Sequence, residues 1–196
     1  MNRLKSAVCA PLLVGLVLIF TLVPSQGYAA SSEPASLSSD FPISFEPNLG
    51  QTDAQVRFLT RNRRFRMYLT GNSTVLDIAG DKSGHAVALR TAFSGANPSA
   101  QVSGGDRRSS VSNYLVGPQA KWTTNVPNYA KVRYEAIYPG IDLLYYGSPR
   151  GLEYDFAVAA KADPSAIALM IEGADIVRVN SEGELVLQTG AGEIRW

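Results

Sequence analysis

The stretch YEAIYPGIDLLYYGSPRGLEYDF, residues 134–156, decides the fold class because it has the pattern of a two-faced β-hairpin. Alternate residues of a strand share a face, so Tyr154 and Phe156 are expected on one side and Glu153 and Asp155 on the other. Acidic and aromatic residues at close spacing are also typical of a sugar-cleaving site. The register of the hairpin decides which of these side chains face the core and which are left for a possible sugar-cleaving site.

A four-residue loop over Ser148–Gly151 pairs Tyr145 with Tyr154 and Leu143 with Phe156. Every residue on that face is then apolar or aromatic. A five-residue loop shifts the register by one residue and exchanges the core and solvent faces, so the four-residue loop is predicted. Proline and glycine within this loop suit the second position of a turn and a positive φ.

On the opposite face, Tyr146, Glu153 and Asp155 are expected to be neighbours, together with Asp142. The carboxylates of Glu153 and Asp155 would project about 7 Å apart, a spacing compatible with a pair of glycosidase acids. Tyr146 would be placed to stack on a sugar. Any strand with an acidic outer face has this geometry, however. Sugar or Ca²⁺ binding and a solvated sheet face stay open, and we favour the solvated face over catalysis.

The chain after residue 40 continues as short apolar alternations separated by turns rich in Gly, Pro and Asn, which predicts an all-β, largely antiparallel β-sandwich with short hairpins. Predicted strands are Val56–Thr60, Phe65–Leu69, Thr74–Ile78, Ala86–Phe93, Tyr114–Val116, Ala130–Tyr134, Asp142–Tyr146, Leu152–Val158, Ala168–Glu172, Ile176–Val179 and Leu185–Thr189. A turn is predicted at Gly104-Gly105. Asp163 and Pro164 predict a single helical turn, as its cap and first residue.

The N-terminus predicts export, by a signal helix at residues 1–29. Arg3 and Lys5 precede an apolar run, and Gly27-Tyr28-Ala29 offers small residues to a signal peptidase. Cleavage after Ala29 is preferred over an uncleaved anchor helix, because the run is short for a membrane span. Membrane contact is therefore expected only through this segment before cleavage, and the mature protein is expected to be secreted or to lie at the cell surface.

Composition limits the possible partners. The chain has 196 residues and a net charge of +1. Removing residues 1–29 removes two basic residues and the single cysteine, which leaves a net charge of −1 and no disulfide. A nucleic-acid partner is not expected. Residues 30–40 form a predicted flexible linker, and residues 41–196 form the predicted domain.

Two further features contain residue types that are common in binding or catalytic sites. The stretch RNRRFR carries Arg61, Arg63 and Arg64, which could bind an anion such as lipopolysaccharide or an acidic glycan, but a charged hairpin tip is the favoured interpretation. His85 is the only histidine, and we expect it to be an ordinary surface residue. No catalytic residue, metal site or cofactor is predicted.

Four stretches resemble a family. FEPNLGQ, at residues 45–51, is similar to the F-E-x-N-x-G-Q opening of an uncharacterised β domain near the N-terminus of bacterial secreted proteins with β-propeller (SBBP-type) repeats. Residues 113–158, from NYLVG to LEYDFAV, resemble its central block. Residues 162–175 and 183–195 are similar to its closing strands. The final GEIRW stops within an expected strand, which predicts a truncated domain.

The resemblance implies a β-rich domain with no assigned catalytic residues. It therefore implies a non-catalytic module of a secreted or cell-surface protein, with an architectural or recognition role. Partners would be a glycan, an envelope component or C-terminal repeat domains of a longer chain. The alternative is an extracellular carbohydrate-binding or carbohydrate-active domain that uses the acidic and aromatic sheet face.

Overall fold

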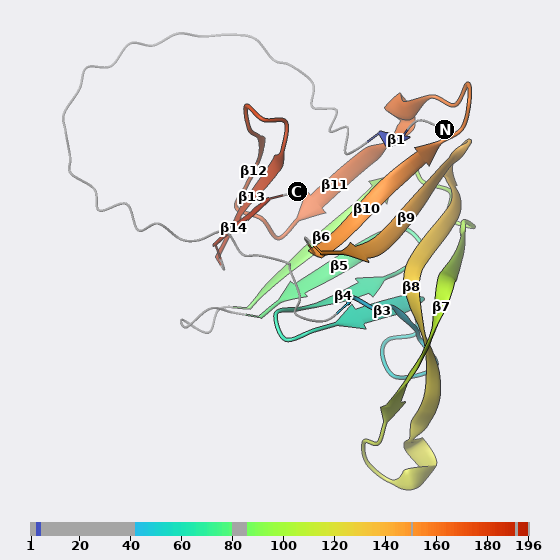
Figure 1. Ribbon diagram of the computed structural model, residues 1–196. Helices are drawn as coiled ribbons and strands as arrows, with labels where there is room; N and C mark the ends of the chain where they lie inside the picture. The colour runs from blue at the N-terminus through green and yellow to red at the C-terminus, as the bar shows by residue number, and fades with distance from the viewer. Residues whose placement is uncertain (1–2, 5–41, 80–85, 150, 191, 196) are drawn as a thin grey trace, which may run out of the picture.

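The computed structural model describes residues 3–4, 42–79, 86–149, 151–190 and 192–195. The predicted signal segment (apart from Arg3 and Leu4), the predicted linker and His85 lie outside the described residues. Within them the protein is built from antiparallel strands and two single-turn 3₁₀ helices, η1 (Gln119–Lys121) and η2 (Pro164–Ala166) (Figure 1). The all-β, antiparallel prediction is confirmed.

Three sheets contain all the described strands. The first sheet runs, in spatial order, β1 (Arg3–Leu4), β10 (Gly151–Val158), β9 (Ile141–Ser148), β8 (Thr123–Tyr138) and β7 (Gln101–Tyr114). The second runs β11 (Ala168–Glu172), β6 (Val87–Ser94), β5 (Ser73–Ile78), β4 (Phe65–Leu69), β3 (Phe58–Arg61) and β2 (Glu46–Pro47). The third consists of β12 (Ile176–Val179), β13 (Leu185–Thr189) and β14 (Gly192–Arg195).

The β9–β10 hairpin has the predicted register. Tyr154 pairs with Tyr145, and Phe156 pairs with Leu143. Leu143, Tyr145 and Phe156 are each at most 4% exposed. Burying such side chains stabilises a fold by about 1.5–3 kcal/mol each, so the register that buries this face prevails over its one-residue slip.

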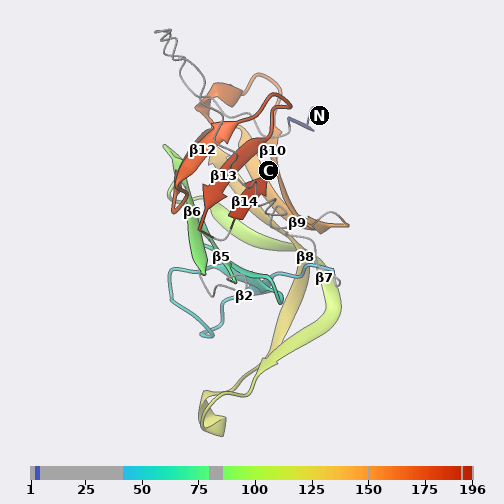
Figure 2. The same cartoon turned by 90° about the vertical axis from the view of Figure 1, so that its left-hand side faces the viewer.

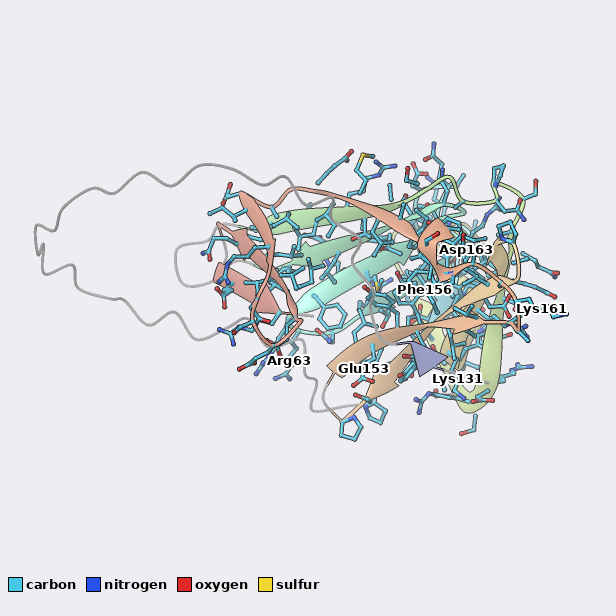
Figure 3. All side chains as sticks on the ribbon, turned by 90° about the horizontal axis from the view of Figure 1, so that it is seen from above. Arg63, Lys131, Glu153, Phe156, Lys161 and Asp163 are labelled. Carbon is cyan, nitrogen blue, oxygen red and sulfur yellow. The ribbon has the colours of Figure 1, made fainter. Side chains whose placement is uncertain are left out.

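One core joins the sheets. Phe93 of β6 contacts Tyr134 of β8 edge to face, with ring centroids 5.9 Å apart, and Tyr134 contacts Tyr145 at 6.2 Å. In Figure 3 the Phe156 side chain lies among the side chains gathered inside the molecule, whereas Lys161 lies at its edge. Leu187 and Ile194 of the third sheet belong to the same buried cluster. The first and second sheets thus share an interior, and the third contributes to it.

Strand β8 bends between its two ends. Its pairing with β9 shifts register between Tyr134 and Tyr138, and Ala136 takes a φ of 49°. Asp142 holds this bulge: its Oδ1 accepts a 2.7 Å hydrogen bond from the Ala136 N–H, and its Oδ2 lies 2.6 Å from Nη2 of Arg133. A bulge increases local twist, which is consistent with the change of direction of β8.

The predicted strand Ala130–Tyr134 is too short, and the predicted strand Tyr114–Val116 is misplaced. Strand β8 spans sixteen residues and β7 fourteen, and β7 ends at Tyr114. The predicted turn at Gly104-Gly105 is wrong, because both glycines lie inside β7. Gly104 packs under the Tyr129 ring, where an added Cβ would lie 2.5 Å from Cγ of the ring. Figures 1 and 2 show the far end of the β7–β8 hairpin projecting away from the sheets.

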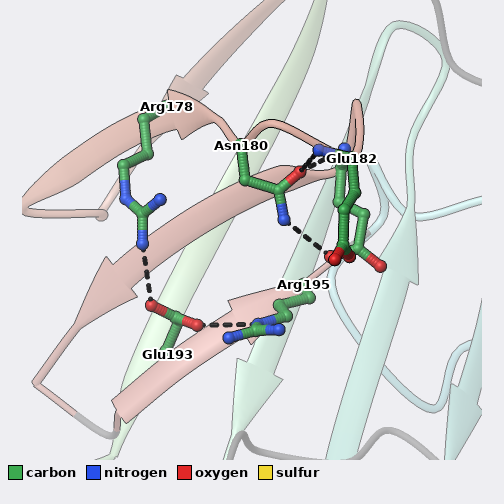
Figure 4. A network of polar contacts seen from close by, with 6 residues as sticks. Arg178, Asn180, Glu182, Glu193 and Arg195 are labelled. Carbon is green, nitrogen blue, oxygen red and sulfur yellow. Dashed lines mark hydrogen bonds and ion pairs between the residues drawn. The ribbon is translucent and has the colours of Figure 1, made fainter.

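The third sheet carries a small polar network on its exposed side (Figure 4). Glu193 accepts hydrogen bonds from Arg195 Nε at 2.7 Å and from Arg178 Nη2 at 3.1 Å. These partners, Arg195 first, lower the pKa of Glu193. Asn180 closes the β12–β13 turn, since its Oδ1 accepts from the backbone N–H of Glu184 at 2.9 Å. Exposed ion pairs contribute little stability, so the turn geometry and the buried face hold this sheet.

Candidate functional site

The structure brings the predicted acidic and aromatic residues together on β9 and β10. Tyr146 pairs with Glu153 across the hairpin, and the Tyr146 hydroxyl donates a 3.1 Å hydrogen bond to Asp155 Oδ2. The Ser148 hydroxyl donates to Glu153 Oε1 at 2.7 Å. Asp155 is only 8% exposed. The predicted solvated face is therefore wrong for Asp155, and both carboxylates accept bonds from their own hairpin.

Tyr146 acts here as a hydrogen-bond donor. Its partial burial, the bond to Asp155 and the nearby carboxylate charges raise the pKa of Tyr146 to about 12. A phenol with this pKa stays protonated at neutral pH and keeps its proton directed at Asp155. The arrangement favours a fixed hydrogen bond over proton transfer.

Asp142, expected beside this group, has another task. It lies on the same face of β9, but its carboxylate caps the β8 bulge and pairs with Arg133. The four acids of the opening stretch therefore do not act together. Asp142 fixes the backbone, and Glu135 lies exposed on β8.

The arginine-rich stretch forms the predicted hairpin tip. Asn62 organises the turn between β3 and β4, since its Oδ1 accepts from the N–H groups of Arg64 at 2.8 Å and Phe65 at 2.9 Å. Arg63 and Arg64 lie exposed in this turn. The Arg61 side chain instead contacts Tyr114, 53 positions away in the sequence, with Arg61 Cζ 4.6 Å from the centroid of the Tyr114 ring. Arg61 is thus bonded to Tyr114, while Arg63 and Arg64 lie at the tip of the turn, and anion binding by these residues stays a prediction.

Asn48, within the FEPNLGQ stretch, organises the loop between β2 and β3. Its Nδ2 donates to the carbonyl oxygens of Asp53 at 2.7 Å and Val56 at 3.1 Å. Its Oδ1 accepts from the Gly50 N–H at 3.1 Å. A buried or half-buried amide that satisfies several backbone groups fixes a loop conformation. This part of the stretch is therefore structural.

A polar cluster that the sequence did not predict lies where the β7–β8 hairpin leaves the sheets. We call the β7–β8 hairpin the arm, and Glu46, Arg61, Ser112 and Tyr114 the arm-base cluster. The Tyr114 hydroxyl donates to Glu46 Oε2 and accepts from Arg61 Nη2, and the Ser112 hydroxyl donates to Glu46 Oε1 at 2.7 Å. Burial, followed by the bond to Glu46, raises the pKa of Tyr114. The cluster links the FEPNLGQ stretch to the start of the central block, and that shared resemblance was the only sequence signal for it.

The described residues contain no cluster of metal-ligating side chains and no membrane-spanning helix. No three Asp, Glu, His or Cys side chains gather there in a way that could hold a metal ion. None of the helices within the described ranges is long and apolar enough to cross a bilayer.

The sequence of residues 45–196 matches the family described as "Domain of unknown function (DUF7948)". No curated protein and no solved structure matches the chain. The match spans the arm-base cluster, the β7–β8 and β9–β10 hairpins and the third sheet.

Proposed function

The chain belongs to the DUF7948 family, and we propose that it is a non-catalytic module of an exported bacterial cell-surface protein, with an architectural or recognition role. The observation that carries this is the bonding of Glu153 and Asp155. Each carboxylate accepts a hydrogen bond from a hydroxyl of its own hairpin, Ser148 and Tyr146 respectively. A glycosidase needs one acid free to protonate the leaving oxygen and one free to attack or activate water.

The residues of the family-like stretches support the same proposal. Asn48 stabilises a loop, and Glu46 and Tyr114 join the arm to the sheets. These structural roles account for the resemblance of the stretches to the family without a catalytic task for their residues. We therefore place function on the surfaces that the fold presents.

We further propose that the first and second sheets are the two layers of a β-sandwich, that residues 1–29 direct export, and that the module belongs with SBBP-type repeat proteins. The shared core supports the sandwich. Export and the repeat context rest on the sequence pattern. Expression with the native N-terminus in a bacterial host tests export: mass spectrometry of the released protein should give a chain that starts at residue 30.

A glycan panel tests the catalytic alternative. The wild-type chain should release no sugar from the panel. Hydrolysis that disappears in Glu153→Gln/Asp155→Asn but persists in Glu172→Gln would overturn the non-catalytic proposal. Glu172 is a suitable control because it is an exposed acid on β11 paired with Arg90. Glycan-array binding that depends on Tyr146 would favour a carbohydrate-recognition role.

A further inference from the structure

The end of the β7–β8 hairpin contains the longest run of exposed residues in the described chain, residues 115–122. We call residues 113–125 the arm tip. All of its residues are exposed except Tyr114 and Thr123, which are partly buried. In Figure 2 this tip, with η1 at its end, lies far from the sheets and from the third-sheet strands.

Large apolar side chains gather at the tip. Leu115 is 56% exposed, Val116 77% and Trp122 40%. Val111, just before the tip, is 45% exposed. Four of the nine large apolar side chains that are exposed in the described residues thus fall within twelve consecutive positions. A grouping of this kind on a projecting element indicates an interaction surface, whereas single exposed apolar residues do not.

Charge on the outer part of the arm, residues 107–134, has one sign. Residues 107–134 contain no Asp or Glu but contain Arg107, Arg108, Lys121, Lys131 and Arg133. Lys131 and Arg133 are paired with Asp106 and Asp142. Lys121 is the only charged residue of the tip itself. An apolar end with a lysine and no carboxylate is complementary to a surface that is apolar inside and anionic outside.

Polar groups at the tip are already bonded in a way that suits the interface of a bilayer. The Trp122 indole N–H donates to the Gly117 carbonyl at 3.1 Å. The Lys121 N–H donates to Pro118 O at 2.8 Å, and the Trp122 N–H donates to Gln119 O at 3.0 Å. Tryptophan is enriched at membrane–water interfaces, and internal bonding lowers the cost of leaving water.

The arm-base cluster fixes the direction of the tip. Tyr114, the second residue of the tip, is held by Glu46 and Arg61 from the second sheet. A docking element supported at its base loses less conformational entropy on binding.

We propose that the arm tip inserts shallowly into the surface of a bilayer that contains anionic lipids, through Leu115, Val116 and Trp122 with Lys121 at the headgroups. The proposal extends the proposed cell-surface role and relies on it only for the presence of an envelope membrane. Binding to vesicles and export in a host are separate measurements, so either can fail without the other.

The test uses the full chain carrying Trp196→Phe, which leaves Trp122 as its only tryptophan. Vesicles contain phosphatidylcholine alone or an equal mixture with phosphatidylglycerol, each with brominated acyl chains. Mixed vesicles should quench Trp122 and shift its emission to the blue. This readout reports on the tip itself, so binding through the apolar N-terminal segment does not imitate it.

Paired variants make the test specific. Leu115→Ser/Val116→Ser should weaken partitioning into mixed vesicles about tenfold. Ile176→Ser/Val177→Ser removes two residues of comparable exposure from β12, 56% and 48%, and should leave partitioning unchanged. Lys121→Gln should weaken it about fivefold on mixed vesicles and not on phosphatidylcholine alone.

Three results would overturn the proposal. Trp122 could stay unquenched on bound vesicles, or the two serine pairs could have equal effects. Alternatively, sedimentation could show that the chain self-associates and that Leu115→Ser/Val116→Ser abolishes this association, while vesicles leave Trp122 unquenched. That result would assign the tip to contacts between copies of the chain.

Discussion

The guanidinium carbon of Arg61 lies 4.6 Å from the centre of the Tyr114 ring. This contact joins the end of β3, in the second sheet, to the base of the arm. The Tyr114 hydroxyl is shared between Arg61 and Glu46. Fifty-three positions separate Arg61 and Tyr114 along the chain. This contact therefore couples the position of the arm to the folding of the second sheet.

Tyr114→Phe should lower the free energy of unfolding by about 1.5–3 kcal/mol, because Glu46 and Arg61 lose a charge-assisted partner. Tyr68→Phe on β4 is the matched control and should cost less than about 0.5 kcal/mol. Urea unfolding measures both. Amide exchange should rise in β7 and β8 near residue 114 only in the first variant, and equal exchange in both would contradict the anchoring role.

Phe156→Ala should destabilise the protein by about 3–5 kcal/mol, since it removes a side chain that is 3% exposed and in ring contact with Tyr138 and Tyr154. Glu153→Ala, on the other face of the same strand, should cost about 1 kcal/mol. The difference in urea midpoint between the two variants checks which face is the core. Equal midpoints would contradict the observed register.

Gly173→Ala should be much more damaging than Gly183→Ala. Both glycines have positive φ, 91° and 84°, so each substitution carries the strain of a left-handed conformation, about 1 kcal/mol. At Gly173 the new Cβ would also lie 2.2 Å from the Ala88 carbonyl oxygen, whereas at Gly183 no heavy atom lies within 4 Å. That backbone clash should add about 1–3 kcal/mol. Thermal unfolding of the two variants gives the comparison.

Alkaline pH should unfold the protein through its buried tyrosines. Burial raises the pKa of both Tyr134 and Tyr145 above the ordinary value of 10.0. The folded state therefore holds these protons more tightly than the unfolded state, and their contribution is complete below pH 10 and is lost as the pH rises above it.

The urea midpoint should accordingly stay level up to about pH 9 and fall above about pH 10, together with the ultraviolet signal of tyrosinate. Tyr145→Phe should make this fall shallower. A fall that begins near neutral pH would point to other groups.

Several short strands bounded by turn residues were predictable. The strands Phe65–Leu69, Ala168–Glu172, Ile176–Val179 and Leu185–Thr189 have the predicted bounds. The pairing of Tyr145 with Tyr154 followed from a single requirement, that apolar residues share a face. Asp163 also caps its short helix as expected, accepting from the Ser165 N–H at 2.9 Å. In Phe65–Leu69 and Ala168–Glu172 the alternation in the sequence agrees with the alternation in burial.

Strand β7 was not predictable, because its sequence QVSGGDRRSSVSNY is poor in strand-forming residues. Pairing with β8 imposes its conformation, and tertiary pairing leaves no periodic signal. The arm-base cluster was hidden for the same reason: Glu46 and Tyr114 meet across 68 positions. The burial of Asp155 likewise depends on what covers the outer face of the hairpin, which the alternation of one strand does not determine.

The irregularity of β7 has a consequence for solubility. Among the described strands of the first sheet, this fourteen-residue strand has β8 as its only neighbour, so one long edge faces outward. Its register breaks between Arg107 and Val111 and again between Ser112 and Tyr114, and Asp106 has a φ of 54°. A regular strand of another molecule could match only short portions of such an edge. The kinks that bend the arm therefore also protect the chain from edge-to-edge aggregation.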